Sequence, residues 1–215
     1  AEGRAEAGAA ATRDRPLLGL ACVAVWLFLA FAASLVGIWW AIGGAAVALG
    51  GAVAVVAGAD LKPLSRPTPR LVTLGLAAGA VSVGASYALY PLLVRLAPWA
   101  TLETELLYAA FRAPSLLVAS VVLVPIILGE EVVWRGVVQS ALARRLGRWG
   151  GALAAGTVYA LASVAIGSPL LVLISLALGL LWSLLRALTG SLVPTLVSHV
   201  VWNAVVLLWL PFDVM

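Results

Sequence analysis

Long apolar runs separated by short polar gaps make up the chain from residue 17 to residue 210. A helix needs roughly 20 predominantly apolar residues to span a bilayer, and the first run, 17–59, is about twice that length. We divide it near Trp39 and Trp40, because tryptophan is enriched at the membrane–water interface. The pattern then predicts about seven transmembrane helices, of which the last five are 71–94, 115–143, 149–166, 170–185 and 192–210.

The gaps between these runs have the composition of loops. Residues 60–70 contain three prolines and are predicted to form a loop. Residues 95–113 mix charged and aromatic side chains, and we expect a connector at the membrane surface that includes a short amphipathic helix. Pro114 suits the first position of the helix that follows, where a backbone N–H is not needed.

The chain is predicted to be one membrane domain in three parts. Residues 1–15 are polar and Ala-rich, and we expect a mobile N-terminus. Residues 16–113 contain the N-terminal spans and the connector, and residues 114–215 form a core that carries the polar motifs described below. The first apolar run is too long for a secretory signal peptide and no cleavage site closes it, so we interpret it as a retained span.

The composition agrees with the pattern. The chain of 215 residues is 64% hydrophobic and 10% charged, with a mean hydropathy of +1.13. Soluble domains are about 45–50% apolar and about 25% charged, so this composition predicts an all-α polytopic transmembrane helix bundle with the lipid bilayer as its first partner. Most of the nine tryptophans are interpreted as interface anchors.

The positive charge of the chain predicts its orientation rather than a nucleic-acid partner. The net charge is +4, but the basic residues lie in the gaps between apolar runs instead of on one exposed face. With the N-terminus in the cytoplasm, Arg95 and Arg112 lie outside and ten basic residues lie inside, which is a strong positive-inside asymmetry. Those ten are Arg4, Arg13, Arg15, Lys62, Arg66, Arg70, Arg144, Arg145, Arg148 and Arg186.

Four ionisable residues interrupt the apolar helices. Glu130, Glu131 and Arg135 lie in the run 115–143, and His199 lies in the last run. A charged side chain at a helix centre costs about 2.5–3.5 kcal/mol on insertion scales. Such residues normally face a bundle interior or a wet cavity, so we regard these four as candidates for a functional site.

The helical spacing arranges the polar residues in pairs. Glu131 and Arg135 are four residues apart on one face, in the favourable acid-then-base order, and this predicts a buried ion pair. Glu130 points about 100° away from Glu131 and is free for another partner. Two other helices present pairs at the same spacing, and these are His199 with Asn203 and Tyr159 with Ser163.

The predicted depths allow the three pairs to meet in the cytoplasmic half of the bundle. His199 lies about 12 Å from the cytoplasmic end of its helix, and Glu130 and Ser163 about 20 Å from theirs. A carboxylate beside an imidazole in a dry cavity suits general-base chemistry, and a histidine beside an asparagine suits oxyanion stabilisation. The structural alternatives are an ion pair that satisfies itself for Glu131 and interhelical hydrogen bonding for His199 and Asn203.

At these residues the sequence resembles the CPBP family, which comprises CAAX prenyl endopeptidases and bacteriocin-processing proteins and is also called Abi. The family motif E-E-x-x-x-R corresponds to Glu130, Glu131 and Arg135, and H-x-x-x-N corresponds to His199 and Asn203. The segment 179–192 also resembles the glycine-rich helix and T-G-S-L turn that precede the third motif. The resemblance covers roughly residues 114–210.

The resemblance implies roles for these residues. It implies that Glu130 activates water, that Glu131 and Arg135 organise the site, and that His199 and Asn203 stabilise the oxyanion. The implied reaction is hydrolysis of a peptide or protein substrate, a prenylated tail or a peptide precursor, within or beside the membrane.

The chain departs from the family at the second motif, F-x-x-x-H, which reads Tyr159 to Ser163. A serine hydroxyl is no base near neutral pH and cannot replace imidazole as a zinc ligand. With His199 as the single histidine of the chain, a tetrahedral zinc site is poorly supplied with ligands. We therefore expect no cofactor, although the resemblance alone permits zinc.

Three classes of function remain open from the sequence. The first is an intramembrane endopeptidase of the CPBP type. The second is a catalytically silent relative that acts as a scaffold or as a subunit of a membrane complex, and Ser163 favours it. The third, a proton-coupled transporter or channel, would also use buried Glu and His, but the chain shows no inverted repeat or pair of broken helices.

Overall fold

A computed structural model of the chain describes residues 15–37, 39–111 and 115–212. All regular structure within these ranges is helical and none of it is strand, which confirms the predicted all-α bundle. Most of the expected mobile N-terminus, together with Arg112 and Pro114, falls outside the described residues. The main helices are α2 (Arg15–Val36), α3 (Gly44–Leu61), α4 (Pro69–Leu96), α5 (Trp99–Phe111), α6 (Leu116–Glu131), α7 (Gln139–Ser163), α8 (Pro169–Thr189) and α9 (Val193–Trp202).

Short segments with altered winding join or extend these helices. Three are wider, π-type segments, and two are tighter 3₁₀ turns. A π-helix is rare and appears mostly as a bulge within an α-helix, frequently at functional sites. The π segments are η1 (Trp39–Gly43), η3 (Val132–Val138) and η5 (Asn203–Trp209), and the 3₁₀ turns are η2 (Lys62–Ser65) and η4 (Val164–Ile166).

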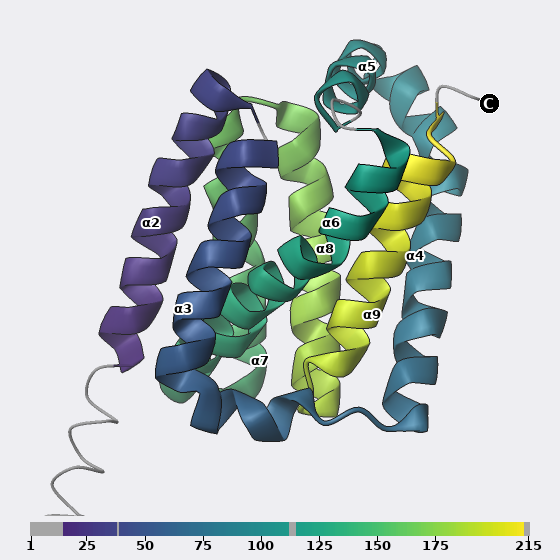
Figure 1. Ribbon diagram of the computed structural model, residues 1–215. Coiled ribbons are helices and arrows are strands. Elements are labelled where there is room, and N and C mark those ends of the chain that lie inside the picture. The colour runs from purple at the N-terminus through teal and green to yellow at the C-terminus, as the bar shows by residue number, and fades with distance from the viewer. Residues whose placement is uncertain (1–14, 38, 112–114, 213–215) are drawn as a thin grey trace, which may run out of the picture.

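Among the described residues, four helical stretches are long and apolar enough to cross a membrane, and Leu17–Ala32 and Val193–Trp209 are shorter apolar helices. The longest stretch, Leu116–Ile166, has 51 residues but reverses direction at Gly147, where φ is 73° and ψ is 173° (Figure 1). Beyond the reversal the two arms pack so closely that a Cβ on Gly151 would lie 2.4 Å from the Cα of Ala143. The described residues therefore form the seven apolar segments predicted from the runs.

Capping residues explain where the helices begin. The hydroxyl of Thr68 accepts a hydrogen bond from the backbone N–H of Leu71, and Ser168 accepts one from Leu171. Each cap is followed by a proline at the first helical position, which suits a helix start because that N–H has no helical partner. These signals fix the starts of α4 and α8 next to their loops.

A glycine contact sets the position of α6 against α3. A Cβ on Gly129 would lie 2.0 Å from the carbonyl oxygen of Ala46, and a Cβ on Gly50 would lie 2.4 Å from the Cα of Gly129. Only hydrogen atoms fit between the two backbones at this crossing. The contact holds the residue before Glu130 in place.

The two ends of the bundle differ. At one end the loop after η2, the reversal at Gly147 and the turn between α8 and α9 come together, because the N–H of Leu192 donates to the carbonyl of Leu64 and Arg148 donates to the carbonyl of Ala187. We call this the basic end, since it gathers Lys62, Arg66, Arg70, Arg144, Arg145, Arg148 and Arg186.

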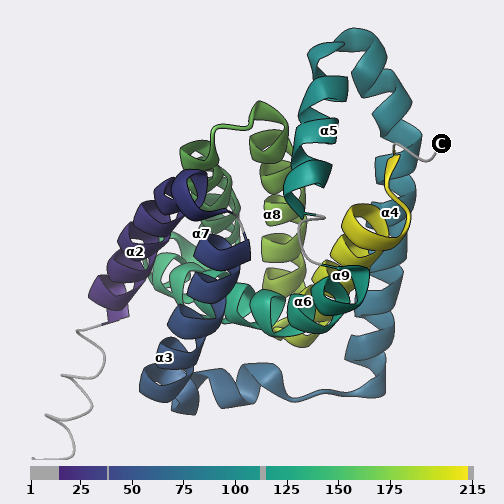
Figure 2. The same cartoon turned by 45° about the horizontal axis from the view of Figure 1, so that its top comes forward.

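The opposite end carries α5, which lies beside α4 and α8 (Figure 2). Glu103 of α5 accepts a hydrogen bond from the Ser168 hydroxyl at 2.5 Å. The connector predicted for residues 95–113 thus contains the expected short helix.

Four of the nine tryptophans do not lie at the surface of the bundle. Trp26, Trp134, Trp182 and Trp202 are 1–4% exposed. Trp26 and Trp134 pack edge to face with ring centroids 5.6 Å apart, so these rings fill the interior of the bundle. Run length and composition do not distinguish the inner face of a membrane helix from its lipid face.

Candidate active site

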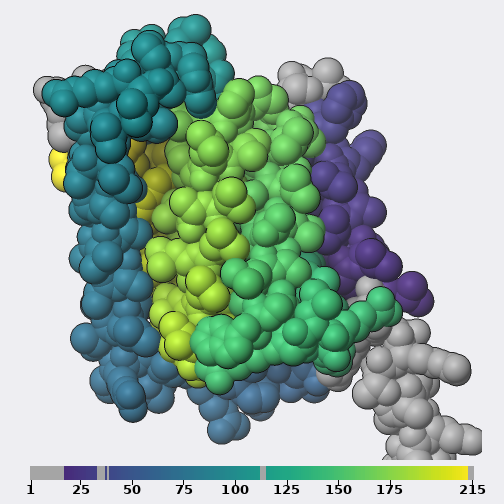
Figure 3. Space-filling model, turned by 180° about the vertical axis from the view of Figure 1, so that it is seen from behind, coloured from purple at the N-terminus to yellow at the C-terminus, as the bar shows by residue number. Residues whose placement is uncertain are grey.

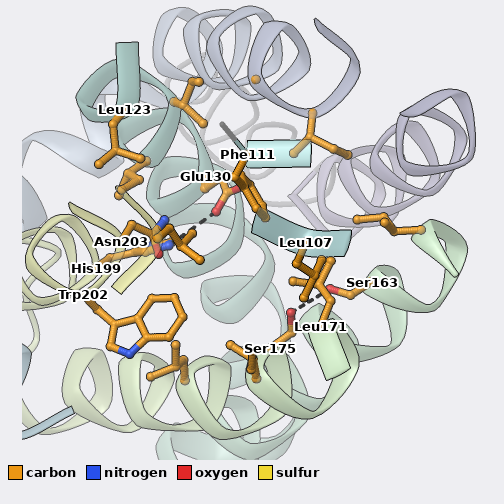
Figure 4. Close-up of a pocket in the computed structure, with 18 of the residues that line it drawn as sticks. Leu107, Phe111, Leu123, Glu130, Ser163, Leu171, Ser175, His199, Trp202 and Asn203 are labelled. Atoms are coloured by element: carbon orange, nitrogen blue, oxygen red, sulfur yellow. Dashed lines mark hydrogen bonds and ion pairs between the residues drawn. The ribbon is translucent and has the colours of Figure 1, made fainter. Parts of the chain in front are cut away.

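A cavity of about 130 Å³ in the middle of the bundle is lined by Glu130 and by two of the three predicted pairs, Tyr159 with Ser163 and His199 with Asn203. Glu130 comes from α6, Tyr159 and Ser163 from α7, and His199 and Asn203 from α9 and the start of η5. Figure 4 shows Glu130, His199 and Asn203 grouped on one side of this cavity and Ser163 on another. The helices that carry these predicted residues therefore meet at the cavity, whereas Glu131 and Arg135 do not line it.

The E-E-x-x-x-R and H-x-x-x-N motifs each overlap a π segment. The first π segment begins directly after Glu131 and contains Arg135, and the last begins at Asn203. A π segment widens the turn and shifts the side chains that follow relative to a regular α-helix. The winding itself could not be anticipated from the spacing of the motifs.

Glu131 and Arg135 form the predicted ion pair behind the cavity. Arg135 Nη1 lies 3.2 Å from Glu131 Oε1, and both side chains are 1% exposed. The same carboxylate oxygen lies 2.9 Å from Nδ1 of His199. The guanidinium of Arg135 also lies 4.5 Å from the centroid of the Tyr159 ring, a cation–π contact. Arg135 and His199 thus share one oxygen atom of Glu131, and Tyr159 joins this set through the guanidinium.

Glu130 occupies a different environment from Glu131. The Tyr159 hydroxyl donates to Glu130 Oε2 at 3.3 Å, and Nε2 of His199 lies 3.7 Å from that oxygen. The second distance is longer than a hydrogen bond, and the side chain is 11% exposed. Glu130 therefore faces the cavity and remains accessible from it.

His199 is held in one orientation by its neighbours. Its ring stacks on Trp182 with centroids 3.6 Å apart and an interplanar angle of 23°, and Trp182 Nε1 donates to the hydroxyl of Ser198 at 3.2 Å. The Nδ1–H donates to Glu131, which leaves Nε2 towards Glu130 and the cavity. Nε2 can accept a proton in the neutral ring and can donate only when the ring is protonated.

Ser163 lines the cavity but its hydroxyl is already engaged. It lies 2.9 Å from the hydroxyl of Ser175 and 3.3 Å from the carbonyl oxygen of Tyr159. Ser175 belongs to α8 and was not singled out from the sequence. It shares a face of α8 with Gly179 and Trp182, at spacings of four and three residues, and a polar residue on that face was the signal that could have found it.

The described residues do not fit a zinc site. They contain no group of three or more His, Cys, Asp or Glu side chains that could hold a metal ion. Glu131 is bound by Arg135, and its contact with His199 uses Nδ1. This leaves the Glu130 carboxylate and one imidazole nitrogen facing the cavity, whereas a catalytic zinc needs three protein ligands.

The polar cluster can therefore offer one accessible carboxylate, one oriented imidazole nitrogen and one amide around a small cavity. The amide is that of Asn203, which lines the cavity beside His199. A base next to donors for a developing oxyanion is the arrangement that hydrolysis of an acyl group requires.

Comparison with known proteins agrees with the motifs. The model of the family described as Type II CAAX prenyl endopeptidase Rce1-like matches residues 110–205, somewhat less than half of the chain. No curated protein and no solved structure matches the chain. The matched region runs from the end of α5 to η5 and contains every residue of the candidate site. Over this region the chain is similar to the type II CAAX prenyl endopeptidases, which agrees with the resemblance of its motifs to the CPBP family.

Proposed function

We propose that the protein is an intramembrane endopeptidase that hydrolyses a membrane-associated or prenylated peptide with water activated by Glu130. One observation carries this proposal, namely the contrast between two adjacent carboxylates. Glu131 is bound by Arg135 and His199 and is 1% exposed, whereas Glu130 faces the cavity. A residue that binds and deprotonates water must be accessible in this way.

In the proposed reaction Glu130 removes a proton from a water molecule. The water oxygen forms a bond to the carbonyl carbon of the scissile peptide and produces a tetrahedral oxyanion. The Asn203 amide donates to this oxyanion, and Nε2 of His199 donates to it when the ring is protonated. The carbon–nitrogen bond then breaks, and the proton held by Glu130 passes to the leaving nitrogen.

An apolar cavity beside the candidate site supports a membrane-associated substrate. It has a volume of about 230 Å³ and lies between α4, α5, α8 and η5. The two cavities share Leu107, Ile174 and Trp202 among their lining residues. Figure 3 shows the crevice between α4 and α8, with α9 at its floor. A hydrocarbon chain or apolar side chains in this crevice would lie beside the cavity that Glu130 lines.

The charge distribution supports an orientation with the basic end in the cytoplasm. Leu18, near the start of α2, lies at the basic end, so in this orientation α2 begins on the cytoplasmic side, and we propose a cytoplasmic N-terminus. We propose the cytoplasmic membrane of a bacterium as its location.

The test is a comparison of protein termini in the native host between the wild type and Glu130→Ala at matched protein level. Glu105→Ala is the control, because it removes a carboxylate from α5 that does not line the cavity. We expect a set of termini that is present in the wild type and the control and is lost in Glu130→Ala. Identical termini in all three strains would contradict the peptidase.

A second candidate function is a catalytically silent scaffold or subunit of a membrane complex. It is favoured by Ser163, whose hydroxyl is bound to Ser175 and offers no base. In that case the protein copurifies with a stable set of membrane proteins, and Glu130→Ala leaves this set intact. Affinity purification from the same strains as above distinguishes the two functions.

A further inference from the structure

A separate cavity of about 500 Å³ opens at the basic end, where α2, α3, η3, α7 and α8 meet. None of the residues that line it lines the central cavity. Three arginines, Arg144, Arg148 and Arg186, face it together with a single acidic residue, Asp60. The lining thus carries more positive than negative charge.

Two of these arginines, Arg148 and Arg186, lie together at the end of α8. Arg148 donates through Nε to the carbonyl of Ala187 at 2.5 Å and through Nη2 to that of Leu188 at 2.9 Å, so its guanidinium is fixed at the end of α8. Arg186 directly precedes Ala187 in α8, so the like charges of Arg148 and Arg186 lie at the same wall of the cavity. Neither arginine forms an ion pair with a carboxylate in the described part of the chain, and the buried Nε–H of Arg186 lacks an acceptor there.

The cavity has the chemistry of a site for phosphate. Guanidinium groups match the geometry of phosphate oxygens and bind them with paired, charge-assisted hydrogen bonds. Basic pockets between transmembrane helices on the cytoplasmic side are known to bind lipid headgroups. Leu18, Leu61 and Val137 provide apolar walls beside the arginines, and such walls suit the glycerol and first methylene groups of a lipid.

We propose that the cavity at the basic end binds the phosphate group of an anionic ligand, with Arg186 and Arg148 as its principal contacts. A phosphodiester lipid headgroup and free phosphate share this chemistry. The bound anion offsets the repulsion between the two arginines and therefore stabilises the ends of α7 and α8.

The experiment measures binding to the purified full chain in neutral detergent by the shift in thermal unfolding. Three probes are compared, namely dioctanoylphosphatidylglycerol, inorganic phosphate and uncharged dioctanoylglycerol. We expect the anionic lipid to raise Tm, dioctanoylglycerol to have no effect, and Arg186→Gln to weaken the lipid affinity by about tenfold or more. Arg186→Lys, which keeps the charge, should recover part of it.

Arg145→Gln is the matched control, because it removes an exposed positive charge at the same end but does not line the cavity. Should Arg186→Gln fail to fold, Ser140→Asp replaces it, since this change places a carboxylate in the cavity and removes no arginine. If inorganic phosphate raises Tm as much as the anionic lipid does, and if Arg186→Gln or Ser140→Asp abolishes this rise, the natural ligand is free phosphate. Absence of binding, or binding that Arg186→Gln and Arg145→Gln weaken equally, would overturn the proposal.

Discussion

The two sides of the His199 ring face two different kinds of polar environment. On the Nδ1 side, Glu131 and Arg135 form a closed set of contacts at 2.9 and 3.2 Å, with all side chains buried. On the Nε2 side, Glu130 lies 3.7 Å away and borders the cavity with Asn203 and Ser163. We call these the paired side and the cavity side. The difference teaches that adjacent, chemically identical glutamates can serve structure and chemistry separately.

The largest effect is expected from Glu130→Gln on the cavity side. The change keeps the shape of the side chain but removes the base, so hydrolysis should fall by about 10³-fold or more, while Tm stays close to that of the wild type. The measurement is the rate of cleavage of a substrate identified from the lost termini, together with thermal unfolding in detergent. A large loss of Tm would mean that the two sides are not separable.

Arg135→Ala tests the paired side. It leaves the buried Glu131 carboxylate with one charged partner fewer, and removal of one member of a buried pair costs about 3–5 kcal/mol. We expect reduced accumulation in the membrane and a clearly lower Tm, whether or not the protein is an enzyme. The exposed Arg145→Ala serves as the comparison, and wild-type accumulation of Arg135→Ala would contradict the structural role.

Asn203→Ala removes the proposed oxyanion donor from the cavity side. Loss of one such donor typically lowers kcat by about 10²–10³-fold, and because the interaction forms in the transition state, KM should change little. Steady-state kinetics on the identified substrate provide the measurement. An unchanged kcat would leave Asn203 as a packing residue of α9 and η5.

The smallest expected effect, and the only gain, comes from Ser163→His. An imidazole at this position adds a base to the cavity, and we expect hydrolysis to rise by about tenfold. Ser163→Ala is the control, because it removes the contact with Ser175 without adding a base. If Ser163→His lowers activity as much as Ser163→Ala, the serine is better suited to the cavity than an imidazole.

Local pattern was sufficient for the features that depend on one helix. The length of the apolar runs predicted the bundle, and the four-residue spacing of Glu131 and Arg135 predicted their ion pair, because both follow from helix geometry. The same reasoning treated Glu130 as turned away from Glu131. In the structure both glutamates approach His199, one at each ring nitrogen.

Features that depend on packing between helices were not accessible. The stacking of Trp182 on His199 joins α8 to α9, and the Ser163–Ser175 contact joins α7 to α8. A tryptophan in an apolar run has the same sequence signature whether it faces lipid or the interior. The π segment from Asn203 likewise arises without a proline or glycine that would mark it, and the one after Glu131 contains only Gly136, a residue that is common throughout the apolar runs.

The contact of Gly50 with Gly129 has a consequence for how substitutions should be read. A glycine that carries no chemistry lies immediately before Glu130, and its partner lies in another helix far earlier in the chain. Since even a methyl group at either position would force the two backbones apart, a saturation scan should find both glycines as intolerant as the carboxylate itself. The loss of function on substitution at Gly50 or Gly129 would report how closely the two backbones approach. A list of functional residues drawn from such a scan alone would therefore include two residues that do not contact the substrate.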